Sequence, residues 1–216
     1  MDFLGYYYRG DNIMKQLLFL GLLAVLSVVA QEQASFCPML LSEAEQKAMG
    51  YDQQRKMYSL GSRQRLSAAA LKDGSDYLRK RDKAKAMEEF NRAWRFDPTT
   101  PYAYWLAAIV RSMEGQDFKD SALRKKCFED GLKLFEMASK LVPATEKLLT
   151  ENLILDKSET LIQYGLFLKK DNAEQAEKIF KQAEMLLKDF TPGEDERGKQ
   201  VRERINDMHS RIKKAR

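Results

Sequence analysis

Residues that carry chemistry are scarce in this chain, which has two cysteines and one histidine among 216 residues. The histidine, His209, has no cysteine or carboxylate at the spacing of metal ligands. The sequence also lacks a Gly-rich phosphate loop, a Gly-x-Ser-x-Gly motif and an HExxH motif. Paired carboxylates such as Glu88 and Glu89 fall on helix faces that we expect to be exposed, where they cannot be desolvated into acid/base partners. We therefore expect a non-enzyme with no catalytic residue, no metal site and no cofactor.

The two cysteines indicate neither a disulfide framework nor a lipid anchor. Cys127 lies on one helical stripe with Gly131 and Phe135, which predicts a buried thiol. A lipid-anchor site needs a small residue directly before its cysteine, and Cys37 is preceded by the bulky Phe36. An oxidising compartment would permit a bridge between Cys37 and Cys127, and the sequence leaves that pairing open.

A large charge of one sign is missing as well. The chain has 37 basic and 32 acidic residues, which gives a formal net charge of +5. These charges are dispersed along the predicted helices, as is usual for solvated helix faces. The excess is too small to mark a nucleic-acid-binding protein, so we expect no nucleic-acid partner.

The longest apolar run is LLFLGLLAVLSVVA at residues 17–30, which follows Lys15. It is shorter than the roughly 20 residues of a spanning helix and ends in a small-x-small pattern at Ala30. We interpret residues 1–30 as a signal peptide that is cleaved after Ala30, with Met14 as the true start. The alternatives are an uncleaved anchor or a buried first helix. The mature chain is then exported, to the periplasm of a Gram-negative source or otherwise outside the cell, and has no spanning helix.

Packing residues recur along the chain at a fixed interval. Phe90, Phe135 and Phe180 are separated by 45 residues each. The set Ala86, Phe90, Ala93 and Pro98 is matched in spacing by Gly131, Phe135, Ala138 and Pro143, and without a proline by Ala176, Phe180 and Ala183. A fixed period with the same packing residues predicts stacked repeats of helical hairpins.

The pattern resembles the tetratricopeptide repeat (TPR) family. Over residues 67–98 all six motif places match, at Gly74, Tyr77, Ala86, Phe90, Ala93 and Pro98. The match is partial over 101–143, where Ala108 and Arg111 stand at the glycine and tyrosine places, and over 159–188, where Gly165 is one residue out of phase with Phe180. The family repeat is about 34 residues, so these repeats are lengthened. The resemblance implies an all-α helical-hairpin (TPR-like) solenoid.

The expected organisation has three parts after the signal peptide. Residues 31–64 form an N-terminal helical segment that is interrupted around Gly50, and residues 65–190 form the repeats. Within the repeats, we expect Gly115 to end one helix. Residues 144–170 are expected to form one long helix, or two with the break at residues 156–158. Residues 191–216 form a C-terminal capping helix with one apolar stripe, made of Val201, Ile205, Met208 and Ile212.

The resemblance also implies a site, because TPR proteins bind a partner peptide or helix in a concave groove lined by the first helix of each hairpin. The groove places fall here on Leu71, Ser75, Leu78, Tyr102, Trp105 and Ile109. The lysine and asparagine that chaperone-binding members use to hold a carboxylate are replaced by Leu71 and Ser75, which disfavours a chaperone co-factor role. Trp105 has an alternative role as a core residue between repeats.

The function expected from these features is a non-catalytic interaction module that binds a protein or peptide partner of unknown identity. The alternative is a self-associating structural subunit of an envelope assembly. In that alternative, the groove is filled by another copy or by the chain's own residues 31–60. Small-ligand or lipid binding has only the apolarity of residues 101–110 in its favour.

Overall fold

The computed structural model describes residues 34–188 and 190–216. This part of the chain folds into one short 3-10 helix and nine α-helices and contains no strand. The all-α class predicted from the sequence is therefore confirmed. The predicted signal peptide at residues 1–30, its cleavage after Ala30 and the start at Met14 lie outside the described residues.

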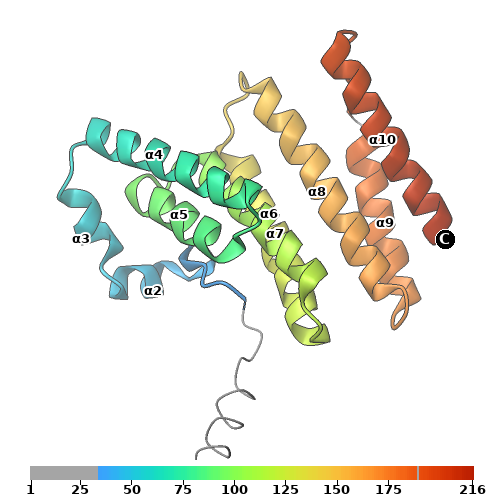
Figure 1. The fold of residues 1–216 in the computed structure, drawn as a ribbon, viewed down its shortest axis with the longest axis horizontal. Coiled ribbons are helices and arrows are strands. Elements are labelled where there is room, and N and C mark those ends of the chain that lie inside the picture. Colours follow the sequence, from blue (N-terminus) through green and yellow to red (C-terminus); the bar gives the residue numbers. More distant parts are fainter. Residues whose placement is uncertain (1–33, 189) are drawn as a thin grey trace, which may run out of the picture. The chain divides into compact units, whose positions relative to one another are not determined.

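The helices form three hairpins between an N-terminal segment and a last single helix. In chain order the elements are η1 (Pro38–Leu40), α2 (Glu43–Ala48), α3 (Tyr51–Lys56), α4 (Leu60–Arg79), α5 (Lys83–Phe96), α6 (Pro101–Asp117), α7 (Ser121–Leu141), α8 (Lys147–Leu168), α9 (Ala173–Lys188) and α10 (Glu196–Ala215) (Figure 1). The hairpins are α4/α5, α6/α7 and α8/α9, and they stack through α5 against α6 and α7 against α8. This is the helical-hairpin solenoid that the sequence predicts, with α10 as its capping helix.

Glycine allows the two helices of a hairpin to approach each other closely. A Cβ on Gly74 would lie 2.7 Å from Cδ1 of Phe90, and a Cβ on Gly165 would lie 2.8 Å from Cδ1 of Phe180. Both distances are far below a van der Waals contact, so only glycine fits opposite these rings. Gly165 therefore does in the third hairpin what Gly74 does in the first, and the offset of one residue does not prevent it.

The expected helix end at Gly115 is wrong, and of the two alternatives for residues 144–170 the structure has the single long helix. Gly115 does not end a helix, because α6 continues to Asp117. Gly115 is buried, and a Cβ built on it would lie 3.1 Å from Cδ2 of Phe128. Residues 156–158 do not break a helix, because α8 runs without interruption and Ser158 is fully buried. In both places a residue type that often ends helices instead serves a contact with another helix.

The N-terminal segment is interrupted at Gly50, as expected, where the backbone adopts φ 72°. Glu45 is exposed and forms a capping box with Ser42 at the start of α2. This role explains why a charged residue stands at a place where the repeat pattern has phenylalanine. The first helix of the first hairpin begins at Leu60, before the expected start of the repeats at residue 65.

The capping helix α10 buries the stripe that the sequence indicates. Val201, Ile205, Met208 and Ile212 are all buried. They belong to the same apolar cluster as Phe180 and Leu187 of α9 and Leu161 of α8. The last helix thus covers apolar surface that the third hairpin would otherwise leave exposed.

Candidate functional site

The first helices of successive hairpins lie next to one another. α4 contacts α6, α6 contacts α8, and α10 contacts α8 in the place where a fourth hairpin would begin. The side formed by α4, α6, α8 and α10 is here called the first-helix face. It carries all six residues that the TPR resemblance assigns to a partner groove.

The six predicted groove residues differ in how accessible they are. Tyr102 is the most open, with 38% of its surface exposed. The other five, Leu71, Ser75, Leu78, Trp105 and Ile109, are half-buried. Leu71, Leu78, Trp105 and Ile109 pack against the core cluster that contains Phe90 and Phe135. The Ser75 hydroxyl donates a hydrogen bond of 2.7 Å to the carbonyl of Leu71, which leaves an apolar rather than a polar surface at this point.

Trp105 connects two hairpins. Its indole Nε1–H donates to Oδ2 of Asp156 on α8 at 2.9 Å. Its ring also lies against Tyr102, with 6.1 Å between ring centroids and a tilt of 54°. Because the indole is half-buried and bonded to the next hairpin, Trp105 positions α6 against α8. Its ring also supports one side of the Tyr102 ring. The hydrogen bond to Asp156 thus supports the alternative role of Trp105 as a residue packed between repeats.

A row of three arginines on α10 contacts acidic residues on α8. Arg204 donates to Oδ1 of Asp156 at 2.7 Å, so this carboxylate joins α6, α8 and α10. Arg211 forms two hydrogen bonds of 2.8 Å with Glu159, and Arg197 lies 3.2 Å from Glu151. Arg197, Arg204 and Arg211, here called the arginine ladder, are seven residues apart and therefore share one helix face.

The arginine ladder was not predicted from the sequence. The available signal was the spacing of seven residues between its members, matched by Glu151 and Glu159 about two turns apart on an apolar helix. The ladder adds ion pairs with α8 to the apolar contacts that hold α10 in place. It also neutralises the acidic edge of α8 on the first-helix face.

The environment of Glu159 keeps this carboxyl ionised. Burial raises its pKa, but the hydrogen bonds from Arg211 and Gln163 and the positive charges of Arg211 and Arg204 together lower it by more. The net result is a pKa below the ordinary value of 4.5. Glu159 and Arg211 therefore form a charged, two-point contact at neutral pH.

A second polar cluster, which the sequence analysis also missed, holds residues 34–41 in place. Arg111 and Glu114 of α6 are buried and form an ion pair of 2.7 Å. Glu114 accepts hydrogen bonds from the Ser35 backbone N–H at 3.0 Å and from its hydroxyl at 2.5 Å. The Arg111 guanidinium donates to the Ser35 carbonyl, and Asn91 donates to the carbonyl of Phe36 at 2.6 Å.

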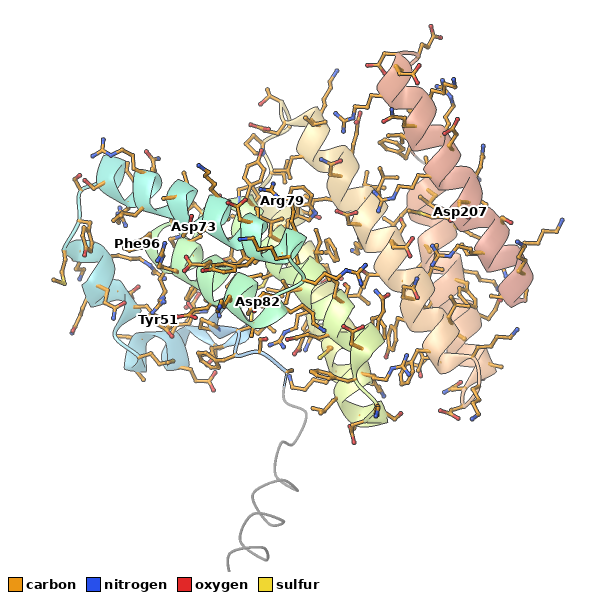
Figure 2. All side chains as sticks on the ribbon, viewed as in Figure 1. Tyr51, Asp73, Arg79, Asp82, Phe96 and Asp207 are labelled. Carbon is orange, nitrogen blue, oxygen red and sulfur yellow. The ribbon has the colours of Figure 1, made fainter. Side chains whose placement is uncertain are left out.

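This cluster corrects one of the alternatives drawn from the sequence. Apart from the bonds of Ser35 to α6, the segment 34–59 lies against the second helices, because η1 contacts α5 and α7 and α3 contacts α5. Tyr51 of α3 is labelled in Figure 2. Its ring meets the Trp94 ring edge-on, with 5.4 Å between the ring centroids. The described part of the N-terminal segment therefore does not fill the groove on the first-helix face.

The described residues offer little reactive chemistry. Cys37 and Cys127 are buried free thiols, and burial raises the pKa of each to about 11. Within residues 34–188 and 190–216, no three His, Cys, Asp or Glu residues are grouped so that they could hold a metal ion. The same part of the chain has no helix long and apolar enough to cross a membrane.

Comparisons with known proteins give no match to this chain. No protein-family model matches it. No curated protein and no solved structure matches it either.

Proposed function

We propose that this protein is a non-catalytic interaction module that binds a peptide or helix of a partner protein on its first-helix face. The observation that carries this proposal is the exposed Tyr102 ring, which lies against Trp105 on α6, while Leu71 and Leu78 of α4 and Ile109 of α6 are half-buried. These side chains stand on helices that are fixed by hairpin packing and by the Trp105–Asp156 contact. A rigid surface loses little entropy when a partner binds, and an aromatic anchor supplies much of the affinity.

The chemistry of this surface defines the class of partner. Leu71 and Ser75 replace a carboxylate clamp, and the nearby Asp156 is already bonded to Trp105 and Arg204. A partner with a charged anchor therefore gains little here. An amphipathic helix or an extended peptide that inserts apolar side chains beside Tyr102 fits better.

The proposal places this module outside the cytoplasm. It rests on the apolar run at residues 17–30 and its small-x-small end. N-terminal sequencing of the protein purified from its own cells tests it, and Gln31 is the expected first residue. An intact Met1 or Met14 at the N-terminus would contradict export by cleavage.

Affinity capture from cells that express the full chain tests the binding function. The wild type is compared with Tyr102→Ala and with Met57→Ala, a matched truncation of an apolar side chain that is 77% exposed elsewhere on the surface. Trp105 is left unchanged, because replacing it would also remove the hydrogen bond to Asp156.

The proposal expects a partner that is retained by the wild type and Met57→Ala and lost from Tyr102→Ala, with unchanged helical circular dichroism. The recovered protein must then bind the purified chain with the same dependence on Tyr102. Recovery of other copies of this chain alone would contradict the proposal and support the self-associating subunit.

A further inference from the structure

Exposed apolar side chains are concentrated at the turn between α3 and α4. The described residues include ten large apolar side chains that are exposed, and four of them lie within residues 57–66. They are Met57 at 77% exposure, Tyr58 at 44%, Leu60 at 60% and Leu66 at 36%. Figure 1 shows this turn at the edge of the described helices, on the side opposite α10. A concentration of this kind marks a surface that binds a protein or a membrane.

Contacts with α5 hold this turn in place. The Tyr58 ring meets the Phe96 ring edge-on, with 5.7 Å between the ring centroids. Beside these rings lies a hollow of about 280 Å³ that Met57 and Arg95 also line. Further along the turn, a Cβ on Gly61 would meet no atom within 4 Å, so the space around this residue is open. The apolar side chains of the turn are therefore presented by a supported backbone and are not covered by another described element.

The charge around this turn is positive. Residues 53–72 form the longest stretch of the described chain without Asp or Glu. The basic residues of this stretch are Arg55, Lys56, Arg63, Arg65 and Lys72. Among the described residues, only Arg55 of these five has an ion-pair partner, which is Asp52 at 2.8 Å.

The acids at both ends of the stretch are already paired. Asp52 pairs with Arg55, and Asp73 lies 3.4 Å from Arg92 of α5. Lys56 and Arg65 are exposed on either side of the apolar turn. A negative charge that balances them would have to come from another molecule.

We propose that the turn between α3 and α4 binds the surface of a membrane that contains anionic lipids. Met57 and Leu60 enter the boundary between the headgroups and the acyl chains, where apolar side chains leave water. Tyr58 has the amphipathic ring that favours this depth. Lys56 and Arg65 flank these residues, and their long side chains reach the lipid phosphates.

The combination of apolar and basic side chains favours a lipid surface over a protein surface. An anionic bilayer offers apolar depth directly beneath negative charge, at every place on its surface. A second copy of this chain would bring the same unpaired Lys56 and Arg65 to a symmetric contact, and these charges would repel each other. The turn does not include Tyr102, so the inference is independent of the partner site proposed above.

Co-sedimentation with lipid vesicles tests the proposal, using the protein purified from cells that express the full chain. Vesicles of equal parts phosphatidylcholine and phosphatidylglycerol are compared with vesicles of phosphatidylcholine alone. We expect stronger binding to the anionic vesicles, and this binding should weaken as salt is added. Met57→Glu should weaken it at least about tenfold, because a charge would then enter the apolar boundary. Lys56→Gln combined with Arg65→Gln should have an effect of similar size, because two attractive charges are lost.

Matched controls separate the turn from the rest of the surface. Met185→Glu changes another methionine, which is 67% exposed. Lys213→Gln combined with Lys214→Gln removes the same net charge from exposed positions on α10. Both controls should bind the anionic vesicles as the wild type does. All substituted side chains are exposed, so the variants are expected to fold, and circular dichroism checks that they do.

Three results would overturn the proposal. The first is no preference for the anionic vesicles, or an equal loss of binding in the controls. The second is binding that the variants at positions 56, 57 and 65 leave unchanged, which would assign it to another segment such as residues 17–30. The third is a concentration-dependent mass in the absence of vesicles that Met57→Glu abolishes, which would make a second copy the partner of this turn.

Discussion

At the N-terminal end, residues 34–59 lie against the second helices α5 and α7 and bond through Ser35 to α6. At the C-terminal end, α10 lies against the first helix α8 and against α9. Residues 34–59, here called the N-terminal cover, bury Met39. They also bury the ion pair of Arg111 and Glu114, in which each side chain is 5% exposed. The helix α10, here called the C-terminal cover, buries one apolar stripe and adds the arginine ladder. In this ladder, Arg211 pairs with Glu159, and the two side chains are 27% and 29% exposed.

The difference teaches how each cover responds to change. A buried ion pair costs most when one partner is removed, because the remaining charge is left without water or counter-charge. A partly exposed pair contributes less and is weakened by salt and by pH. The N-terminal cover should therefore be sensitive to substitution and the C-terminal cover to solution conditions.

The largest expected effect is that of Glu114→Ala. This change leaves the buried Arg111 guanidinium unpaired and removes the acceptor of both Ser35 donors. We expect a loss of about 3–5 kcal/mol in the free energy of unfolding, measured by urea denaturation. Glu203→Ala on the exposed side of α10 is the control and should change little. A similar small effect for both variants would contradict the contrast between the two covers.

Met39→Ala tests the apolar part of the N-terminal cover. Met39 is fully buried between α5 and α7, and truncation should cost about 2–4 kcal/mol through lost transfer energy and a cavity. Met49→Ala, a truncation of a methionine that is 47% exposed in the same segment, provides the comparison. Equal unfolding midpoints for the two variants would show that η1 does not seal this groove.

Arg211→Ala tests the arginine ladder and should have a smaller effect. The two hydrogen bonds of 2.8 Å to Glu159 are partly exposed, so we expect a loss of about 1 kcal/mol. The loss should shrink in high salt, unlike that of Glu114→Ala. Lys213→Ala removes the same charge from the same helix. If Lys213→Ala lowers the free energy of unfolding as much as Arg211→Ala, the loss comes from the change in net charge and not from the ion pair with Glu159.

The smallest expected effect is a pH dependence of the contact between α10 and α8. Because the folded-state pKa of Glu159 is lowered below 4.5, its contribution is fully present above 4.5 and is lost as the pH falls through the folded value. Hydrogen exchange of the α10 amides, corrected for intrinsic rates, should show more opening in that acidic window. Glu159→Gln should remove this dependence, and its persistence in that variant would assign it to another group.

The hairpins could be predicted from the sequence because their packing residues repeat. Phe90, Phe135 and Phe180 define the period, and each ring needs a small residue opposite it, which is Gly74 in the first hairpin and Gly165 in the third. These requirements are local to one hairpin. A single sequence therefore carries enough information to reveal them.

The contacts between hairpins could not be predicted in the same way. Asp156 looked like a helix break because its partners, Trp105 and Arg204, are 51 and 48 residues away. Ser35 and Glu114, which are 79 residues apart, carry no repeat that would link them. The sequence alone does not distinguish a polar residue that caps a helix from one that bonds to a distant helix, because the partner helix is not known.

The central claim is that the first-helix face receives a partner protein. The most direct measurement places the photo-crosslinker benzoylphenylalanine at Tyr102 and, in a second strain, at Glu203, an exposed residue of α10. After irradiation of cells that express the full chain, we predict an adduct with one other protein at position 102 and none at position 203. Equal adducts at both positions, or an adduct at 102 with another copy of this chain, would contradict the claim.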